Sequence, residues 1–366
     1  MQFATYTELL THPEQAATHS LSLKKLLADA DEALAVSRIS VTDNPRLPCS
    51  GDPHDYYSIA PYCHPNPDTE NGLPYVYRDG VYNPEYYECD RPRMDRFCRY
   101  IRTLTLAYLA TREERYRAHA ARLLRCFLVD EETRMNPHLK YAQEIRGKCT
   151  GSPYGIIDLR YHYRVLDMVK LLGDTELEND LKPFYAALLD WLRCSKMGIE
   201  ESGRKNNHGT WYDVTTAAMA HFVGRDELVY EIFSDFAEKR LAPQTEPDGS
   251  YPHELKRTRA YLYSTLNLYG HFLAARMAKQ VGIDLYADGR LKSSVEFMLP
   301  YYADFGKWPY QQIDPVTVEV WEMAYELLYD AARQFGMPTC VDAAEQILKT
   351  RIPDSDIPFL RPSDEG

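Results

Sequence analysis

Helical periodicity recurs along most of this chain, and no β-rich block separates one helical segment from the next. Apolar residues return every three or four positions, the spacing that gives an α-helix one apolar face. The spacing predicts helices over residues 16–36, 92–110, 113–128, 155–173, 176–198, 209–223, 226–240, 255–281, 287–301, 316–336 and 341–350. Turn signals such as Gly173-Asp174 and Gly224-Arg225-Asp226 separate several of these helices. The sequence therefore predicts an all-α fold of antiparallel helical hairpins, arranged as a bundle or a toroid.

The chain shows no internal boundary. No Pro/Ser-rich linker divides its 366 residues, and the lack of a fixed repeat length disfavours a regular solenoid. Residues 40–91 break the helical pattern, because they are rich in Pro, Gly, Asp, Asn and Tyr and have no sustained period. A long irregular segment in a compact domain is usually functional. We expect a single domain over residues 1–366, with part of its site in this segment.

Charge and composition exclude some classes of ligand. The formal net charge is −12, and a general nucleic-acid binder needs a basic surface instead. No apolar stretch is long enough to span a bilayer, so we expect no membrane partner. An anionic ligand stays possible if Arg and Lys gather in a cleft. Tyr is unusually frequent, 29 against 12 Phe, and its flat face and hydroxyl suit polyhydroxylated ligands, although most of these tyrosines are expected only to cover half-buried surface.

Compartment and cofactors are read from the N-terminus and the cysteines. The first twenty residues show no secretory signal, so the sequence predicts a cytoplasmic protein if Met1 is the native start, and a periplasmic or secreted one otherwise. The eight cysteines form no CxxC pair, which favours free thiols and disfavours a zinc site. We expect no metal and no cofactor, and the sequence leaves the oligomeric state open.

Three polar, aromatic segments lie between predicted helices, at residues 50–65, 136–158 and 204–213. Loops carried on a rigid scaffold often hold binding and catalytic residues. Each segment taken alone is equally well explained as turn and capping chemistry, because Asn and Asp favour turns.

Taken together, these segments carry a resemblance. With NNHGTWYDV at residues 206–214, the sequence resembles the alginate lyase superfamily of polysaccharide lyases, in the branch that has this string. Further blocks follow the family's order: SGDPHDYYSIAPY (50–62), RDGVYNPE (78–85), NPHLKYAQ (136–143) with GIID (155–158), and PDGSYPHELKRTRAYLYSTLNL (247–268). The chain departs from the family at Pro53, where a Lys is usual, and at Cys63 and His64, where two Trp are usual. These departures leave the sugar contacts of that loop open.

The resemblance implies a fold and a reaction. The fold would be an (α/α) toroid or incomplete barrel of about six to seven helical hairpins, with a cleft or tunnel for an acidic polysaccharide and no required metal. The reaction would be β-elimination on a β-1,4-linked polyuronate (alginate, polymannuronate or glucuronan), which leaves a 4,5-unsaturated uronate end.

β-Elimination of a 4-linked uronate needs three groups. The C5 carboxylate must be neutralised, and the amide of Asn207 and the fork of Arg257 suit that task. A base must take the C5 proton, and an acid must protonate the leaving O4. His208 is a candidate base or donor near neutral pH. Tyr263 is a candidate acid, or a base if nearby cations lower its pKa from about 10.

Tyr263 and Tyr261 compete for the catalytic role. Arg257 and Tyr261 are i and i+4 on a helix and share a face, but the alignment of the block with the family places the catalytic tyrosine at Tyr263. In D-mannuronate and D-glucuronate, H5 and O4 lie on the same side, so one tyrosine can serve as base and acid. In L-guluronate they lie on opposite sides, so His208 must face Tyr263. The sequence leaves the sugar open.

Seven further residues are candidates for substrate binding: His54, Tyr57, Tyr141, Gln143, Arg204, Lys205 and Trp211. A solvated basic patch explains Arg204 and Lys205 equally well, and packing is the favoured interpretation of Trp211. Two other functions stay open: a glycoside hydrolase on the same fold, which needs a pair of carboxylates that no spacing singles out, and a non-catalytic carbohydrate-binding protein.

Overall fold

The computed structural model describes Leu10 and residues 19–360 of the chain. It is mostly helical, with 64% helix and few strands, which confirms the class predicted from the periodicity. The helices of the described residues are α3 (Ser20–Leu34), α4 (Arg91–Thr111), α5 (Glu114–Leu128), α6 (His162–Leu172), α7 (Thr175–Cys194), α8 (Lys196–Ser202), α9 (Asn207–Phe222), α10 (Asp226–Ser234), α11 (Ala242–Gln244), α12 (Pro252–Leu255), α13 (Ala260–Gln280), α14 (Arg290–Ala303), α15 (Val318–Phe335) and α16 (Pro338–Arg351). None of the described helices is long and apolar enough to cross a membrane.

Every predicted helix has a counterpart, but four predicted helices are split. Residues 176–198 divide between α7 and α8, and residues 226–240 divide between α10 and a π-helical segment, Ala237–Leu241. Residues 155–173 form a 3₁₀ segment, Pro153–Leu159, and then α6. Residues 255–281 divide between α12 and α13, because the backbone of Thr258–Ala260 pairs with residues 311–313 instead of continuing a helix. Of the first predicted helix, residues 16–18 lie outside the described residues, and the described part is α3.

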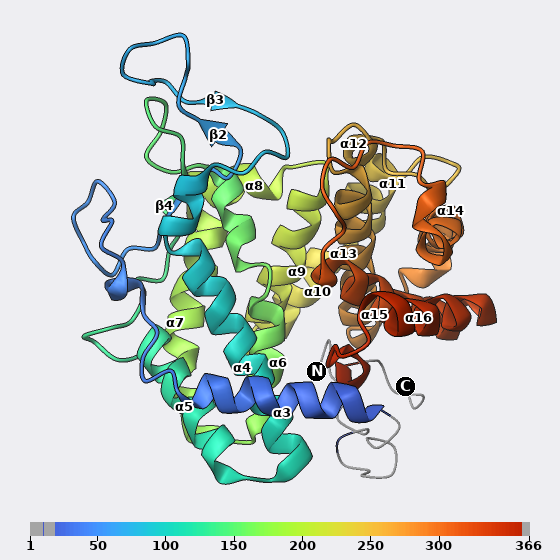
Figure 1. Cartoon of the computed structure of the whole chain (residues 1–366), viewed down its shortest axis with the longest axis horizontal. Helices are drawn as coiled ribbons and strands as arrows, with labels where there is room; N and C mark the ends of the chain where they lie inside the picture. The colour runs from blue at the N-terminus through green and yellow to red at the C-terminus, as the bar shows by residue number, and fades with distance from the viewer. Residues whose placement is uncertain (1–9, 11–18, 361–366) are drawn as a thin grey trace.

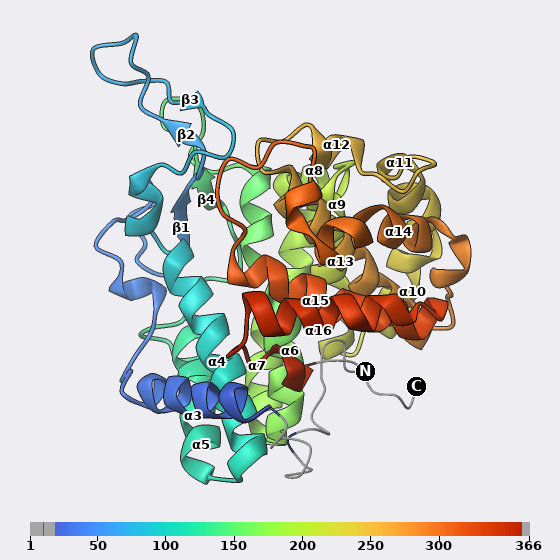
Figure 2. The same ribbon diagram turned by 45° about the vertical axis from the view of Figure 1, so that its right-hand side comes forward.

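Helices α9 and α13 pack against each other in the interior, and both are buried along almost their whole length. Figures 1 and 2 show them between a group formed by α4 to α7 and a group formed by α14 to α16. Close approach depends on Gly270, since a Cβ there would lie 2.9 Å from the Thr210 methyl carbon. This packing fixes the first turns of α9 and α13, from which the main candidate residues project.

Residues 40–91 form no long helix, as their lack of helical period indicated, and they contain short strands that the sequence did not predict. Strand β1 (Tyr57–Ile59) pairs in parallel with β4 (Tyr141–Glu144), and β2 (Cys63–His64) pairs antiparallel with β3 (Val76–Tyr77). The loop that joins β2 to β3 projects from one end of the molecule (Figure 1). All eight cysteines lie in the described part of the chain and are free thiols, as predicted.

Candidate functional site

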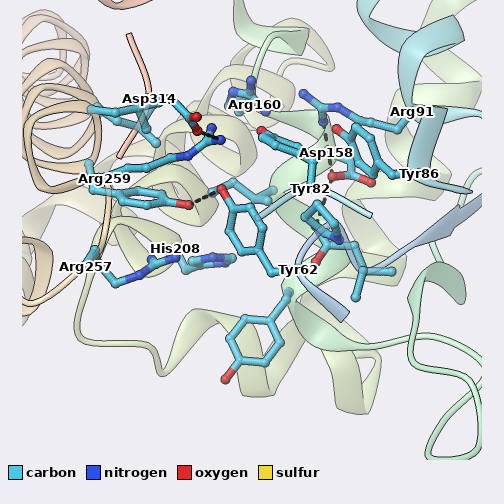
Figure 3. Close-up of a pocket in the computed structure, with 18 of the residues that line it drawn as sticks. Tyr62, Tyr82, Tyr86, Arg91, Asp158, Arg160, His208, Arg257, Arg259 and Asp314 are labelled. Carbon is cyan, nitrogen blue, oxygen red and sulfur yellow. Dashed lines mark hydrogen bonds and ion pairs between the residues drawn. The ribbon is translucent and has the colours of Figure 1, made fainter. Parts of the chain in front are cut away.

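A cavity of about 970 Å³ lies where four parts of the chain meet. The first part is the irregular segment from Ala60 to Tyr87. The second is formed by residues 143–160 together with Arg91 at the start of α4. The third is formed by the start of α9, residues 257–259 just before α13, and the first turns of α13. The fourth is the segment from Gln312 to Thr317 and the first turns of α15. Figure 3 shows the labelled side chains around it. The chain thus brings segments separated by more than two hundred residues to one cavity.

Tyr263 lies in the first turn of α13 with its hydroxyl 2.6 Å from that of Tyr62. The guanidinium of Arg257 lies over its ring, 3.8 Å from the centroid. Burial raises the pKa of Tyr263 to about 12, although Arg257 and the bond to Tyr62 act to lower it. A pKa lowered by nearby cations was the condition for Tyr263 to act as a base; Arg257 acts in that direction, but desolvation outweighs it and the net shift is upward. Tyr263 is protonated at neutral pH.

Arg257 is held by Asp79. Its Nη2 donates to Asp79 Oδ1 at 2.6 Å and its Nε donates to the same oxygen at 3.0 Å, which leaves Nη1 for a ligand. Asp79 also accepts from the backbone N–H of Thr258 at 2.9 Å. Burial opposes ionisation of Asp79, yet these donors hold its pKa well below the ordinary range. The adjacent Gly80 has φ +75°, and a Cβ there would lie 2.3 Å from the Thr258 hydroxyl, so this close approach requires glycine.

His208 lies in the first turn of α9 and lines the cavity. Its Nδ1 is 2.5 Å from Oε1 of Glu201, a fully buried carboxylate on α8. The ring also meets the ring of Tyr154 edge to face, with centroids 5.3 Å apart. Because Nδ1 is bonded to Glu201, Nε2 is the ring nitrogen left for proton transfer.

Asn207 is fully buried and does not line the cavity. Its Nδ2 donates to both carboxylate oxygens of Glu254 at 2.9 Å, and its backbone N–H donates to Oε1 at 2.8 Å. Burial raises the pKa of Glu254, against the lowering effect of these bonds. In this arrangement the amide predicted to neutralise the sugar carboxylate is engaged by a protein carboxylate.

A buried ion pair holds the loop that precedes His208. Asp213 accepts from Arg240 Nε at 2.7 Å, and Arg240 donates to the carbonyl oxygens of Ser202 and Arg204, both at 2.7 Å. Through Arg240, these bonds connect residues 202–204 to Asp213, which lies in the second turn of α9. Asp213 therefore pairs with a buried cation of the protein and does not line the cavity.

The opposite part of the cavity is formed around Asp158. Its carboxylate accepts from Tyr56 at 2.9 Å, from Ser58 at 3.0 Å and from Gln143 at 3.2 Å, and it pairs with Arg91 at 3.2 Å. Gln143 lines the cavity, as a substrate-binding residue must, and has φ +50°. Its side-chain N–H is directed to Asp158.

The other predicted substrate-binding residues lie outside the cavity lining. Tyr57 and Tyr141 are paired across β1 and β4, and the Tyr57 hydroxyl donates to Glu144. The ring of His54 bonds the carbonyl oxygen of Arg134 at 2.7 Å. Three residues from the 204–211 segment are placed as follows: Arg204 is paired with Glu200 and lies over the Tyr154 ring, Lys205 is exposed, and Trp211 is buried and donates to the carbonyl oxygen of Leu266.

Sequence reasoning missed two walls of the cavity. One is a cluster of tyrosines whose rings contact one another in series: Tyr62, Tyr77, Tyr82, Tyr86 and Tyr87. The excess of Tyr in residues 56–87 was the available signal. The other wall comes from residues 312–323, which had no motif to mark them. Across the whole lining, four arginines face three carboxylates, so the cavity is more cationic than the chain as a whole: Arg91, Arg160, Arg257, Arg259 against Asp158, Asp314, Glu319.

The described residues hold no cluster of three or more His, Cys, Asp or Glu suited to a metal ion. What the cavity does offer is a proton donor (Tyr263), a ring nitrogen (His208) and a cation (Arg257) around one space. Ionisable side chains gathered around one cavity in a helical fold are typical of an enzyme.

Comparison with known proteins identifies the family to which the chain belongs. The sequence profile of the family described as alginate lyase matches residues 40–308. The crystal structure of an alginate lyase from Bacteroides ovatus is similar over 93% of both chains, with 34% sequence identity and a TM-score of 0.87. The chain therefore belongs to the alginate lyase family, and it is a polysaccharide lyase.

More distant structures share the fold. Alginate lyase A1-III from Sphingomonas species A1 has 15% identity and a TM-score of 0.53, with 79% of this chain and 81% of that chain covered. A variant of A1-III complexed with a tetrasaccharide has 14% identity and a TM-score of 0.53, with 95% and 97% covered. A search of curated proteins found no match. The family match ends at residue 308, before the wall formed by residues 312–323.

Proposed function

We propose that this polysaccharide lyase cleaves β-1,4-linked polyuronate by β-elimination and leaves a 4,5-unsaturated uronate end. Alginate is the first candidate substrate, and polymannuronate and glucuronan are the narrower alternatives. One observation carries the proposal: the Tyr263 hydroxyl and the His208 ring line a single cavity whose arginines outnumber its carboxylates. The similar enzyme from Bacteroides ovatus, described as an alginate lyase, supports the choice of polymer.

Arg257 is the group we assign to the C5 carboxylate of the sugar. Its Nε and Nη2 are bonded to Asp79, but Nη1 remains, and the guanidinium borders the cavity next to Tyr263. Asn207 must release Glu254 before its amide can donate to a sugar. A fixed cation beside the reacting carbon stabilises the enolate-like charge as it develops, because it needs no reorganisation at that moment.

Proton transfer then depends on the sugar. For mannuronate or glucuronate, Tyr263 takes the C5 proton and returns a proton to O4 from the same side. For guluronate, His208 takes the C5 proton and Tyr263 donates to O4. Both schemes use the position of Tyr263 under Arg257, whose charge favours the ionised phenol.

The lining carboxylates do not suit hydrolysis. A glycoside hydrolase needs two carboxylates free to act on the bond. Asp158 accepts four bonds or ion contacts, Asp314 pairs with Arg259, and Glu319 pairs with Arg160. Each is neutralised by an arginine, which supports elimination over hydrolysis.

Two finer features belong to the same proposal. We place the chain in the branch of the superfamily that carries the string at residues 206–214, and we infer that its helices form an incomplete toroid of helical hairpins in one domain. The NNHGTWYDV motif and the high TM-score with the Bacteroides ovatus enzyme support both.

A panel of polymers tests the function. The enzyme is incubated with polymannuronate, polyguluronate and glucuronan, and the ultraviolet absorbance of the unsaturated uronate is followed. Rising absorbance on at least one polymer is expected. New reducing ends without absorbance would show hydrolysis, and no product from any of the three would refute a polyuronate substrate. The ranking of the three rates identifies the sugar.

A further inference from the structure

We propose that Glu201 is a positioning residue that fixes the tautomer and orientation of His208, so that Nε2 is presented to the cavity as a base. The kinetic tests of this inference rest on the proposed function. The predicted tautomer of His208, in contrast, can be measured without any substrate. Glu201 belongs to none of the segments in which the sequence showed a resemblance.

The contact between the two side chains is short and specific. His208 Nδ1 and Glu201 Oε1 are 2.5 Å apart, and Glu201 is fully buried. The other oxygen, Oε2, has no hydrogen-bond partner in the described part of the chain, and its nearest cation, Arg204 Nε, is 3.6 Å away. A buried carboxylate is costly unless it is bonded, so His208 is the main group that keeps Glu201 in place.

The bond determines which nitrogen carries the proton. A carboxylate can only accept, so in the neutral ring Nδ1 must be the donor and Nε2 must hold the lone pair. When Nε2 takes a proton from the sugar, the negative charge of Glu201 stabilises the imidazolium. This is the role that an orienting carboxylate has beside other catalytic histidines.

Packing holds the ring on a second side. Tyr154 meets His208 edge to face, and Arg204 lies 4.3 Å from the centroid of the Tyr154 ring. The histidine is therefore held by Glu201 at Nδ1 and by Tyr154 at its side, and its remaining nitrogen is left for the substrate.

The stereochemistry of elimination gives a selective test. Guluronate needs His208 as base, whereas mannuronate is served by Tyr263 alone. Loss of Glu201 should therefore damage the reaction on polyguluronate more than the reaction on polymannuronate. A purely structural role for Glu201 would lower both rates by the same factor.

The first experiment compares Glu201→Gln with Glu200→Gln. Both lie on α8, but Glu200 is exposed and its ion pair among the described residues is with Arg204. For Glu201→Gln we expect kcat on polyguluronate to fall about 10²-fold with KM nearly unchanged, because the charge that stabilises the imidazolium is lost. On polymannuronate we expect a loss below about tenfold, and Glu200→Gln should change neither rate by more than about twofold. Equal losses on both polymers would overturn the proposal.

The second experiment asks whether Glu201 acts through His208. The double variant Glu201→Gln, His208→Ala should be no slower than His208→Ala alone on polyguluronate, since the residue through which Glu201 acts is already gone. A further loss of tenfold or more in the double variant would show that Glu201 acts elsewhere and would refute a positioning role.

A third measurement needs no Glu201 variant, in case that substitution prevents folding. Nitrogen NMR of histidine-labelled wild-type protein, with the His208 signal assigned by its loss in His208→Gln, should show the proton on Nδ1. A proton on Nε2 in the neutral ring would overturn the proposal. If the wild-type enzyme cleaves polymannuronate but not polyguluronate, the proposed function holds and this measurement alone decides the role of Glu201. If it cleaves none of the polymers, the proposed function fails, but this measurement still tests Glu201.

Discussion

The two ends of the cavity both contain charged and tyrosine side chains, but these side chains form different numbers of hydrogen bonds and ion pairs with the rest of the protein. At one end, called here the reactive end, Tyr263, Arg257 and His208 each form hydrogen bonds with only one or two of the described side chains, and each lines the cavity. At the other, the buried end, Asp158 and Arg91 are almost fully buried and bonded to several groups. Figure 3 shows the two ends on opposite sides of the cavity.

This difference distinguishes side chains that can react with a ligand from side chains that stabilise the fold. A charged group that lines a cavity can react only if it keeps a donor or acceptor for the ligand, and a fully bonded one mainly stabilises the fold. Residue type and proximity to a cavity would assign Asp158 and Arg91 to catalysis as readily as Tyr263 and Arg257. From the bonding pattern we infer that the proposed reaction takes place at the reactive end.

The largest expected effect is the loss of the reactive hydroxyl. Tyr263→Phe removes the group that protonates O4 in both schemes, so we expect kcat to fall by about 10⁴-fold on every polyuronate that is cleaved. The ring and its contact with Arg257 remain, so oligosaccharide binding, measured by calorimetry, should change by less than about threefold.

Tyr261→Phe is the matched control for this variant. Tyr261 lies two residues earlier on α13, is fully buried and packs against Phe305 and Trp308. Its activity should stay near that of the wild type. If Tyr261→Phe is inactive and Tyr263→Phe is active, the tyrosine has been assigned to the wrong position.

Asp158→Asn tests the buried end. Removal of the charge leaves buried Arg91 with Asp95 as its remaining carboxylate, which should lower the free energy of unfolding by about 3 kcal/mol. Chemical denaturation measures the change. The kcat of the folded protein should fall by less than about tenfold, far less than in Tyr263→Phe. A loss as large as that of Tyr263→Phe, in a protein of unchanged stability, would place Asp158 in the reaction.

The sequence predicted the helical class and the segments that form the reactive end, because periodicity and short motifs are local properties. It did not predict the partners, because these come from other parts of the chain. Asp79 reaches Arg257 across 178 positions, and Glu254 reaches Asn207 across 47. Neither Glu254 nor Glu201 was marked by the sequence as the partner of a candidate catalytic residue.

The raised pKa of Tyr263 shows a second limit. Burial raises this pKa and the charge of Arg257 lowers it, so the direction of the net shift depends on which effect is larger. Only the three-dimensional structure shows that the effect of burial is larger. The walls formed by the tyrosine cluster and by residues 312–323 were missed for the same reason, since only the folded chain brings them to the cavity.

The pH dependence of the rate separates the two roles of Tyr263. With a pKa of about 12, only a small fraction is ionised near neutral pH, so a reaction that uses Tyr263 as base should accelerate about tenfold per pH unit between pH 7 and 9. We expect this slope on polymannuronate. On polyguluronate, where Tyr263 is the acid, the rate should not rise in this way.

The same shift limits the range of the assay. Because the pKa of Tyr263 is raised on folding, its contribution to stability is complete below pH about 10 and is lost as the pH rises to about 12. Rates are therefore compared below pH 10. A flat profile on both polymers would remove Tyr263 as the base.

The smallest expected effect concerns a cation outside both ends. Lys205 is exposed and adjoins the reactive end in sequence, but it does not line the cavity. Lys205→Ala should lower kcat/KM by less than about twofold, and added salt should reduce even that difference, because an exposed charge acts through screened solvent. Steady-state kinetics at low and physiological ionic strength measure the effect. A rise in KM of fivefold or more on long polymers, but not on short oligosaccharides, would extend the binding surface past the cavity mouth and make the reactive end only one part of a longer site.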